Sequence, residues 1–267
     1  MKINNLLVVM RGGGDLATGV AERLFRAGFA IVILEIEKPT AIRLPVSFAR
    51  AVYEGRAIVE GIEAILVPSW GKVKVIIEQK KIPVLIDPQA VCIEKLSPQV
   101  LIDAILAKRN LGTRINQAPL VIGLGPGFVA GEDVDVVIET MRGHNLGRVY
   151  YRGQAIPNTG IPGEVGGESL RRLLQAPVEG RIIPIRKIGD LVKEGEEVAK
   201  VGETPVIAQI SGVLRGLIYP QSWVKKGMKV GDIDPRGVKD YCFTISDKAR
   251  SIGGGVLEAI CAYLNSR

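Results

Sequence analysis

The sequence has 267 residues, and its 35 Lys and Arg against 28 Asp and Glu give a formal charge of +7. A content of 47% hydrophobic and 24% charged residues is typical of a folded globular protein, which excludes a disordered, collagen-like or low-complexity chain. The positive charge suits an anionic ligand, but aromatic residues make up only 5% and the basic residues are scattered, which argues against a nucleic-acid platform.

The apolar run Leu6–Met10 is too short for a secretory signal, and no apolar run approaches the roughly 18 residues of a membrane span. The three cysteines, Cys92, Cys242 and Cys261, are far apart, and the chain has one histidine. We therefore expect no disulfide scaffold and no metal site. We expect a cytoplasmic protein whose partners include neither nucleic acid nor a membrane.

Residues 6–35 predict a strand, a glycine turn, a helix and a second strand. Two apolar runs without polar alternation, 6–10 and 30–34, are typical of parallel strands that are buried on both faces. The turn between them fits the dinucleotide fingerprint, and an acidic residue ends the second run where it could hold a ribose hydroxyl. The alternative is the same turn without a dinucleotide. The candidate cofactor-binding residues here are Gly12, Gly13, Gly14, Asp15, Ala17 and Glu35.

Further short apolar runs at 64–67, 83–86 and 100–102 predict more strands of this sheet. Asp87 and Asp103 follow two of them. Because ligands sit at the carboxyl ends of parallel strands, both are candidate site residues, with Asp87 assigned to cofactor binding. The alternative is that each carboxylate caps a turn.

A second glycine-rich turn follows the apolar run 120–122 and could expose backbone N–H groups to an oxyanion. Its glycines are Gly123, Gly125 and Gly127. Glu139, Arg142 and His144 follow the next run and are our candidate catalytic residues, since acid, guanidinium and imidazole can bind and move protons. The alternative for the glycine run is a turn whose backbone conformation requires glycine. The alternative for His144 is a structural role. The stretch 153–167 is too rich in Gly and Pro for a regular element, so we expect a functional loop or linker.

The last third contains an internal repeat at an offset of 32 residues. Residues 178–182 recur as 210–214, and Val192–Gly195 recurs as Val224–Gly227, which predicts two interlocked β halves. This pattern resembles the barrel-sandwich domains that carry biotin or lipoate, but no lysine lies in Val201–Pro205, where the modified residue would be. We therefore expect a spacer, docking surface or lid. In Asp232–Arg236 we expect a turn with an ion pair rather than a cation site.

The C-terminal segment predicts a helix with Ser246 or Asp247 as N-cap. Because three consecutive glycines, 253–255, are costly in a helix interior, we expect the helix to begin near Gly255. Their alternative roles are a phosphate-binding turn and close packing, and we favour packing.

These elements predict an α/β protein in three parts. We expect a Rossmann-like parallel sheet that binds a nucleotide or cofactor in residues 1–175, a β barrel-sandwich hybrid without modification in 176–240, and a C-terminal helix in 241–267.

Several segments together resemble a known family over nearly the whole chain. They are 11–19, 124–128, 138–147, 158–163, 231–236 and 245–250. The chain is similar here to the selenium-dependent molybdenum hydroxylase system proteins of the YqeB type. The resemblance implies an accessory protein in the maturation of molybdenum hydroxylases, with the hydroxylase or its sulfur- or selenium-transfer machinery as partner. By further analogy to molybdenum-cofactor insertion chaperones, the glycine loops would face a molybdopterin dinucleotide.

Without the resemblance, the residues themselves support only the prediction of a small phosphate-bearing ligand. The alternatives are an NAD(P)-dependent oxidoreductase, which the fingerprint and Glu35 favour, and a non-catalytic docking protein whose glycine turn binds nothing. The default oligomer for a chain of this size is a homodimer.

Overall fold

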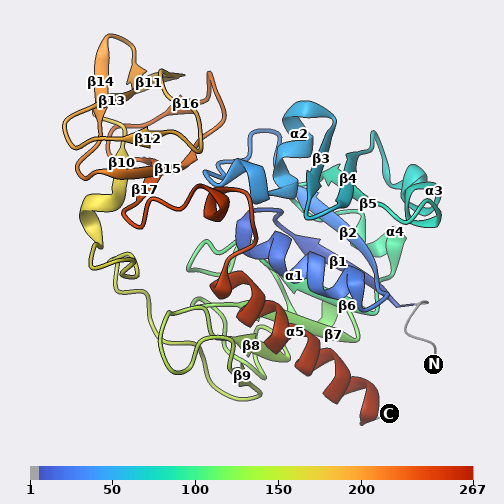
Figure 1. Cartoon of the computed structure of the whole chain (residues 1–267). Coiled ribbons are helices and arrows are strands. Elements are labelled where there is room, and N and C mark those ends of the chain that lie inside the picture. The colour runs from blue at the N-terminus through green and yellow to red at the C-terminus, as the bar shows by residue number, and fades with distance from the viewer. Residues whose placement is uncertain (1–5, 267) are drawn as a thin grey trace. The chain divides into compact units, whose positions relative to one another are not determined.

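The computed structural model describes residues 6–266, which Figure 1 traces from blue to red. The chain divides into two compact units. Unit 1 comprises Met1–Pro39, Ser47–Thr159 and Ile245–Arg267, and unit 2 comprises Thr40–Val46 and Gly160–Thr244. Among residues 6–266, no helix has the length and apolar character that a bilayer crossing requires.

Unit 1 contains a nine-stranded sheet in the order β3-β4-β5-β2-β1-β6-β7-β8-β9. The strands from β4 to β8 in this order run parallel to one another, and β3 and β9 pair antiparallel at the two edges. Their bounds are β1 Leu7–Arg11, β2 Ala30–Glu35, β3 Arg56–Val59, β4 Ile62–Leu66, β5 Ile82–Ile86, β6 Val100–Asp103, β7 Leu120–Leu124, β8 Val136–Ile138 and β9 Val149–Tyr150.

The burial of each strand explains its place in this sheet. The central strand β1 is apolar and buried along almost its whole length, as expected for a strand covered on both faces. β3 alternates exposed and buried residues and forms a hairpin with β4 through the turn Glu60-Gly61. Both turn residues have positive φ, 46° and 81°, which is the geometry of tight hairpin turns.

The helices of unit 1 are α1 Asp15–Arg26, α2 Ala51–Glu54, α3 Val73–Glu78, α4 Ile93–Leu96 and α5 Asp247–Asn265. α1 and α5 pack against each other, as Figure 1 shows, and α5 also packs on β7, β8 and β9. A buried cluster on the sheet includes Val73 of α3 and Ile93 of α4. The C-terminal helix therefore covers β7, β8 and β9, none of which is directly followed by an α-helix in the chain.

Unit 2 contains two four-stranded antiparallel sheets around a common apolar core. One sheet has the order β10-β17-β15-β12 and the other β14-β13-β11-β16. The bounds are β10 Leu173–Gln175, β11 Gly180–Pro184, β12 Leu191–Val192, β13 Glu197–Val201, β14 Thr204–Ile207, β15 Gly212–Leu217, β16 Trp223–Val224 and β17 Lys229–Asp234.

The 32-residue repeat corresponds to three pairs of strands, because β11, β12 and β13 recur as β15, β16 and β17 at that offset. The short strands exchange between the halves: β12 pairs with β15, and β16 pairs with β11. The two β halves are therefore interlocked.

The predicted fold class, a Rossmann-like parallel sheet followed by a barrel-sandwich hybrid, is wrong. The large sheet is mixed, with antiparallel pairs at both edges, and the later strands form two separate antiparallel sheets. Moreover, no α-helix lies between β6 and β7 or between β7 and β8, whereas a doubly wound fold places a helix in each crossover. Local apolar runs identify buried strands, but they do not determine sheet partners or crossover helices.

The predicted start of the C-terminal helix near Gly255 is also wrong, because α5 begins at Asp247 and runs through all three glycines. Its N-cap is Ser246, whose hydroxyl accepts a hydrogen bond from the N–H of Ala249. Packing explains two of the glycines: a Cβ would lie 3.1 Å from the Gly19 oxygen at position 253 and 2.1 Å from the Gly147 oxygen at position 255. The favoured packing role is therefore confirmed at these two positions.

Candidate functional site

The carboxyl edge of the nine-stranded sheet brings together the loops that follow β1, β6, β7 and β8. β1 lies between β2 and β6, so the strand order reverses there. In open sheets with a parallel centre, this reversal leaves a crevice at the carboxyl ends where ligands bind. Gly12 after β1 and Ala104 after β6 border this point.

The first glycine loop combines two tight positions with one open position. Gly12 has φ +94°, and a Cβ there would lie 2.9 Å from the Ala104 oxygen. The Gly13 oxygen accepts hydrogen bonds from the N–H of Ala49 and the hydroxyl of Ser47. At Gly14, the N-cap of α1, a Cβ would meet nothing within 4 Å, and no side chain caps the helix. The α1 N-terminus therefore has uncapped N–H groups beside open space.

Glu35 faces this loop, but its carboxylate already has partners. Its Oε1 accepts the N–H of Gly13 at 2.6 Å, and its Oε2 accepts the N–H of Ile36 at 3.0 Å. Burial raises the pKa of Glu35, and these two hydrogen bonds act in the opposite direction. The carboxylate thus holds the glycine loop in place, and its contact with a ribose stays a prediction. Asp15 begins α1, and Ala17 is fully buried in its first turn.

The second glycine loop is shaped by close contacts within unit 1. A Cβ at Gly123 would lie 2.6 Å from the Phe128 ring, and one at Gly125 would lie 2.5 Å from the Thr140 hydroxyl. At Gly127, φ is +110° and a Cβ would lie 2.6 Å from the Arg109 backbone. These glycines let the loops after β6, β7 and β8 approach one another.

The three candidate catalytic residues have different surroundings. Glu139 is fully buried, and its carboxylate accepts the N–H groups of Thr140, Met141 and Ile156 at 2.7, 2.7 and 2.8 Å. Arg142 forms a two-point ion pair with Asp247, at 2.8 and 3.1 Å. His144 is exposed. Glu139 therefore organises its loop, and Arg142 links that loop to the start of α5.

The two aspartates at strand ends are both hydrogen-bonded. Asp87 accepts the N–H groups of Val91 and Cys92, at 3.1 and 2.8 Å. Burial alone would raise its pKa, but the hydrogen bonds from Cys92 and Val91 lower it overall. Asp103 is buried beside Arg11 at 3.5 Å, and the Thr113 hydroxyl lies 2.6 Å from Asp103 and 2.5 Å from Arg11. Burial raises the pKa of Asp103, and Thr113 and Arg11 oppose this.

Lys248 is the functional candidate that the sequence patterns missed. It is partly buried in the first turn of α5, and its ammonium group makes no hydrogen bond or ion pair with residues 6–266. Burial lowers its pKa, and the charges of Arg142 and Lys108 lower it further, while Asp15 and Glu139 raise it. The helix prediction placed residue 248 near a helix start, but only the packing of α5 on α1 brings it to this edge.

The structure therefore brings four charged residues, from three loops or helix starts, within electrostatic reach of Lys248: Asp15, Lys108, Glu139 and Arg142. Two of the acidic and basic groups, Glu139 and Arg142, are held by hydrogen bonds or an ion pair. Lys248 and the uncapped α1 N-terminus are both suited to an anion. A cation and backbone N–H donors are the groups that commonly hold phosphate in proteins.

A depression of about 830 Å³ lies elsewhere in unit 1, at the amino ends of β6 and β7 beside α4. Its lining is mixed polar and apolar and includes Glu94, Gln99 and Arg114. Within residues 6–266, no group of three or more His, Cys, Asp or Glu side chains is placed to hold a metal ion.

No family model matches the sequence. The chain is 51% identical over 259 residues to a protein of Escherichia coli strain K12 named "Uncharacterized protein YqeB", and the match covers 97% of this chain and 48% of that protein. The chain thus spans about half the length of this curated relative. The match supports the resemblance to YqeB-type proteins for that half.

Solved structures with a distant likeness include three that cover most of the chain. TcdA (CsdL) has a TM-score of 0.32 and 11% identity, and covers 98% of this chain and 89% of its own. An aspartoacylase family protein from Mesorhizobium loti (TM-score 0.24, 10% identity, 85% and 84% covered) and a succinylglutamate desuccinylase/aspartoacylase from Rhodobacter sphaeroides (0.25, 12%, 85% and 85%) follow. Likenesses at this level carry no argument about either fold or function.

Proposed function

We propose that this protein binds a phosphate-bearing ligand at the carboxyl edge of the nine-stranded sheet, as an accessory protein in the maturation of selenium-dependent molybdenum hydroxylases. The binding part of the proposal is supported by the geometry of unit 1. The maturation part rests only on what the resemblance of the sequence motifs to YqeB-type proteins implies, because the matched relative is named as uncharacterized. A molybdopterin dinucleotide is the ligand that would join the two parts, because its pyrophosphate suits an uncapped helix N-terminus.

One observation supports binding most directly: Lys248 reaches the loop edge as a partly buried cation without a hydrogen-bond partner in residues 6–266. Burying a charge is costly unless it is paired. A phosphate oxygen beside Lys248 would offset that cost, and the N–H groups after Gly14 would supply further donors.

The surroundings of Glu35 weigh against the NAD(P)-dependent alternative. In NAD-binding proteins, an acidic residue at this place accepts the ribose hydroxyls. Here both oxygens of Glu35 accept backbone N–H groups of unit 1, so a ribose would have to compete with the bond from Gly13. The loop is better suited to binding phosphate than to recognising an NAD ribose.

The proposal is tested by calorimetric titration of the full chain with pyrophosphate, CDP, CTP, a molybdopterin dinucleotide, NAD and NADP. We expect selective binding of the molybdopterin or cytidine compounds. Gly14→Val should abolish this binding without unfolding the protein, because the added side chain occupies the open space at the α1 N-terminus. Lys248→Met should weaken it at least tenfold, the loss expected for one charge-assisted hydrogen bond.

The matched control is Lys74→Met, which removes an equally charged but exposed side chain from α3. It should leave the affinity unchanged. The affinity of the wild type should also fall as the pH rises through the lowered pKa of Lys248, below the ordinary value of 10.5, and this step should be missing in Lys248→Met. Full affinity in a folded Gly14→Val variant would remove the loop from the site, and binding of NAD or NADP alone would replace the proposal with the oxidoreductase.

A further inference from the structure

Unit 1 contains a groove that the function proposed for the glycine loops does not use. It is the depression of about 830 Å³ beside α4, and we call it the α4 groove. Its lining comes from three segments of unit 1: residues 89–91 after β5, residues between Ile93 and Gln99, and residues between Arg114 and Pro119. Ligand sites in proteins typically have volumes of about 300–1,000 Å³, so the groove has the size of a binding site.

The floor of the groove belongs to the core of unit 1. Ala90 and Ile93 are members of the buried cluster on the sheet, and Ala118 packs against the same cluster. The two walls, α4 on one side and residues 114–119 on the other, are therefore both anchored in this core.

The groove extends along the direction of the strands. At one end lies Val91, whose N–H donates to Asp87 just after the carboxyl end of β5. At the other end lies Gln99, directly before the amino end of β6. Through the registers of β2 and β1, β5 and β6 end within one residue of the same level. Because β6 has four residues, the two ends are about 13 Å apart, the length of four residues of extended chain.

Several polar groups of the lining have no partner in residues 6–266. The side chains of Gln89 and Asn116 make no hydrogen bond within this range, and Gln117 uses only its Oε1, for a backbone N–H at 2.9 Å. Ala118 has extended backbone, with φ −153° and ψ 164°. Neither its N–H nor its C=O is hydrogen-bonded to residues 6–266. The groove thus offers amide donors and acceptors, and one stretch of extended backbone, to a ligand.

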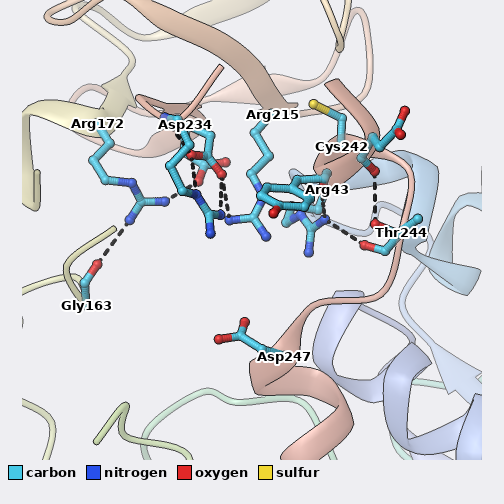
Figure 2. Close-up of polar contacts among 12 residues, drawn as sticks. Arg43, Gly163, Arg172, Arg215, Asp234, Cys242, Thr244 and Asp247 are labelled. Atoms are coloured by element: carbon cyan, nitrogen blue, oxygen red, sulfur yellow. Dashed lines mark hydrogen bonds and ion pairs between the residues drawn. The ribbon is translucent and has the colours of Figure 1, made fainter. Parts of the chain in front are cut away.

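Charged side chains of unit 2, by contrast, are engaged with one another, as Figure 2 shows around Asp234. Arg172 donates to Asp232 at 2.7 Å, and Arg236 donates to both oxygens of Asp234 at 2.9 and 2.6 Å. The ion pair that the sequence predicted in residues 232–236 is therefore confirmed. The free amides of the α4 groove have no such internal partners.

The composition of the lining narrows the class of ligand. Among the lining residues, all within the described part of the chain, Arg114 is the one cation and Glu94 the one anion, and none is aromatic. A single exposed cation beside an anion does not favour a phosphate, and a heterocyclic ring is usually held by aromatic side chains. Amide groups, which carry both a donor and an acceptor, are complementary to a peptide backbone, and aliphatic side chains pack against those of a peptide.

We propose that the α4 groove binds an extended segment of another protein, about four to five residues long and with aliphatic side chains. The N–H and C=O of Ala118 pair with the backbone of this segment, as in recognition by strand addition. Glu94 on one wall and Arg114 on the other favour a segment with a basic residue at one end and an acidic residue at the other. This site does not depend on the function proposed for the glycine loops.

The test titrates the isotope-labelled full chain with the peptide acetyl-Lys-Val-Ala-Val-Asp-amide and follows the amide signals by NMR. The side-chain signals are assigned with single alanine variants. We expect shifts that saturate at the side chains of Gln89, Asn116 and Gln117 and at the N–H of Ala118. Gln79, which is exposed at the end of α3 and outside the groove, is the matched control and should not respond.

The peptide itself tests the backbone pairing without any change to the protein. Methylation of its central backbone nitrogens removes the N–H donors and should weaken binding at least tenfold. Equal binding of the methylated peptide would show that its backbone is not recognised and would overturn the proposal.

The charge pattern is tested with two peptides that carry Lys at both ends or Asp at both ends. Each has one mismatched charge and should bind about threefold more weakly, as expected for the loss of one exposed ion pair. Arg114→Glu should reverse part of this order and prefer the peptide with two Lys, a gain that a merely destabilised variant would not show. Arg56→Glu, which changes an exposed arginine of β3 outside the groove, should keep the wild-type order.

Shifts that do not saturate, or that are equally large at Gln79, would contradict a binding site in the groove. An unchanged order of the three peptides in a folded Arg114→Glu variant would contradict it as well.

Discussion

Two adjacent glycines of α5, Gly254 and Gly255, allow its packing to be tested with the same substitution. A Cβ at Gly254 would meet nothing within 4 Å, whereas a Cβ at Gly255 would lie 2.1 Å from the Gly147 oxygen and 3.2 Å from Ile138. Alanine is favoured over glycine in a helix interior by about 1 kcal/mol. Gly254→Ala should therefore stabilise the protein by about 1 kcal/mol, which raises the melting temperature by roughly 2–4 °C in a protein of this size.

Gly255→Ala gains the same helix propensity but must displace α5 from the backbone of the loop after β8. Overpacking of this kind typically costs 1–3 kcal/mol, and the upper end applies because the contacting atom is backbone. The net effect is a loss of about 2 kcal/mol, or a melting temperature lower by roughly 4–8 °C. Scanning fluorimetry and urea unfolding of the two variants measure this difference. If Gly255→Ala melted at or above the wild type, the close packing of α5 against Gly147 would be refuted.

Three further outcomes follow from the loop after β1 and from the strand ends. Gly12→Ala should lower the melting temperature by roughly 2–8 °C, because it combines a φ of +94° with a 2.9 Å approach to the Ala104 oxygen, while Gly14→Ala, with φ −64° and open space, should change it by less than about 2 °C. Burial raises the pKa of Glu35 above its ordinary 4.5. Protonated Glu35 therefore favours the folded state, and this contribution to stability is lost as the pH rises through the folded pKa. In melting curves from pH 4 to 8, the melting temperature of Glu35→Gln should increase relative to that of the wild type over that rise. The pKa of Asp87 is lowered from 3.8, so Asp87→Asn should melt below the wild type at pH 7, and the gap should close as the pH falls through the lowered pKa.

The sequence predicted those elements whose cause is local. The apolar runs that became β1 and β2 and the turn at Gly12 are each determined by neighbouring residues, as are the cap at Ser246 and the ion pair of Asp234 with Arg236. The repeat also predicted which strands of unit 2 match, because an offset of 32 residues preserves the alternation of buried positions. Strand pairing across the sheets could not be read in this way, since two-residue strands such as β12 have no pattern of their own.

The roles of individual site residues depend on partners that are distant in the chain. Glu35 has the position of a ribose ligand in the sequence, but its carboxylate accepts the Gly13 N–H. Glu139 follows a strand as a catalytic acid could, but three backbone N–H groups surround it. In both cases a buried carboxylate is stabilised by donors that the sequence does not place, because a loop's backbone direction is set by tertiary contacts.

Lys248 shows why such a residue is found only in three dimensions. Its neighbours Lys108, Glu139 and Arg142 lie more than 100 residues away in the chain, and the C-terminal helix brings it to them by packing on small residues of α1. Gly19 lets α5 approach closely, since a Cβ there would lie 2.5 Å from the Cβ of Ala249, the residue next to Lys248. The position of the cation therefore depends on a contact between two small residues. A larger side chain at Gly19 would shift the start of α5 and move Lys248 away from the glycine loop, so the same glycine-rich helix pair that stabilises unit 1 also sets the geometry of its candidate site.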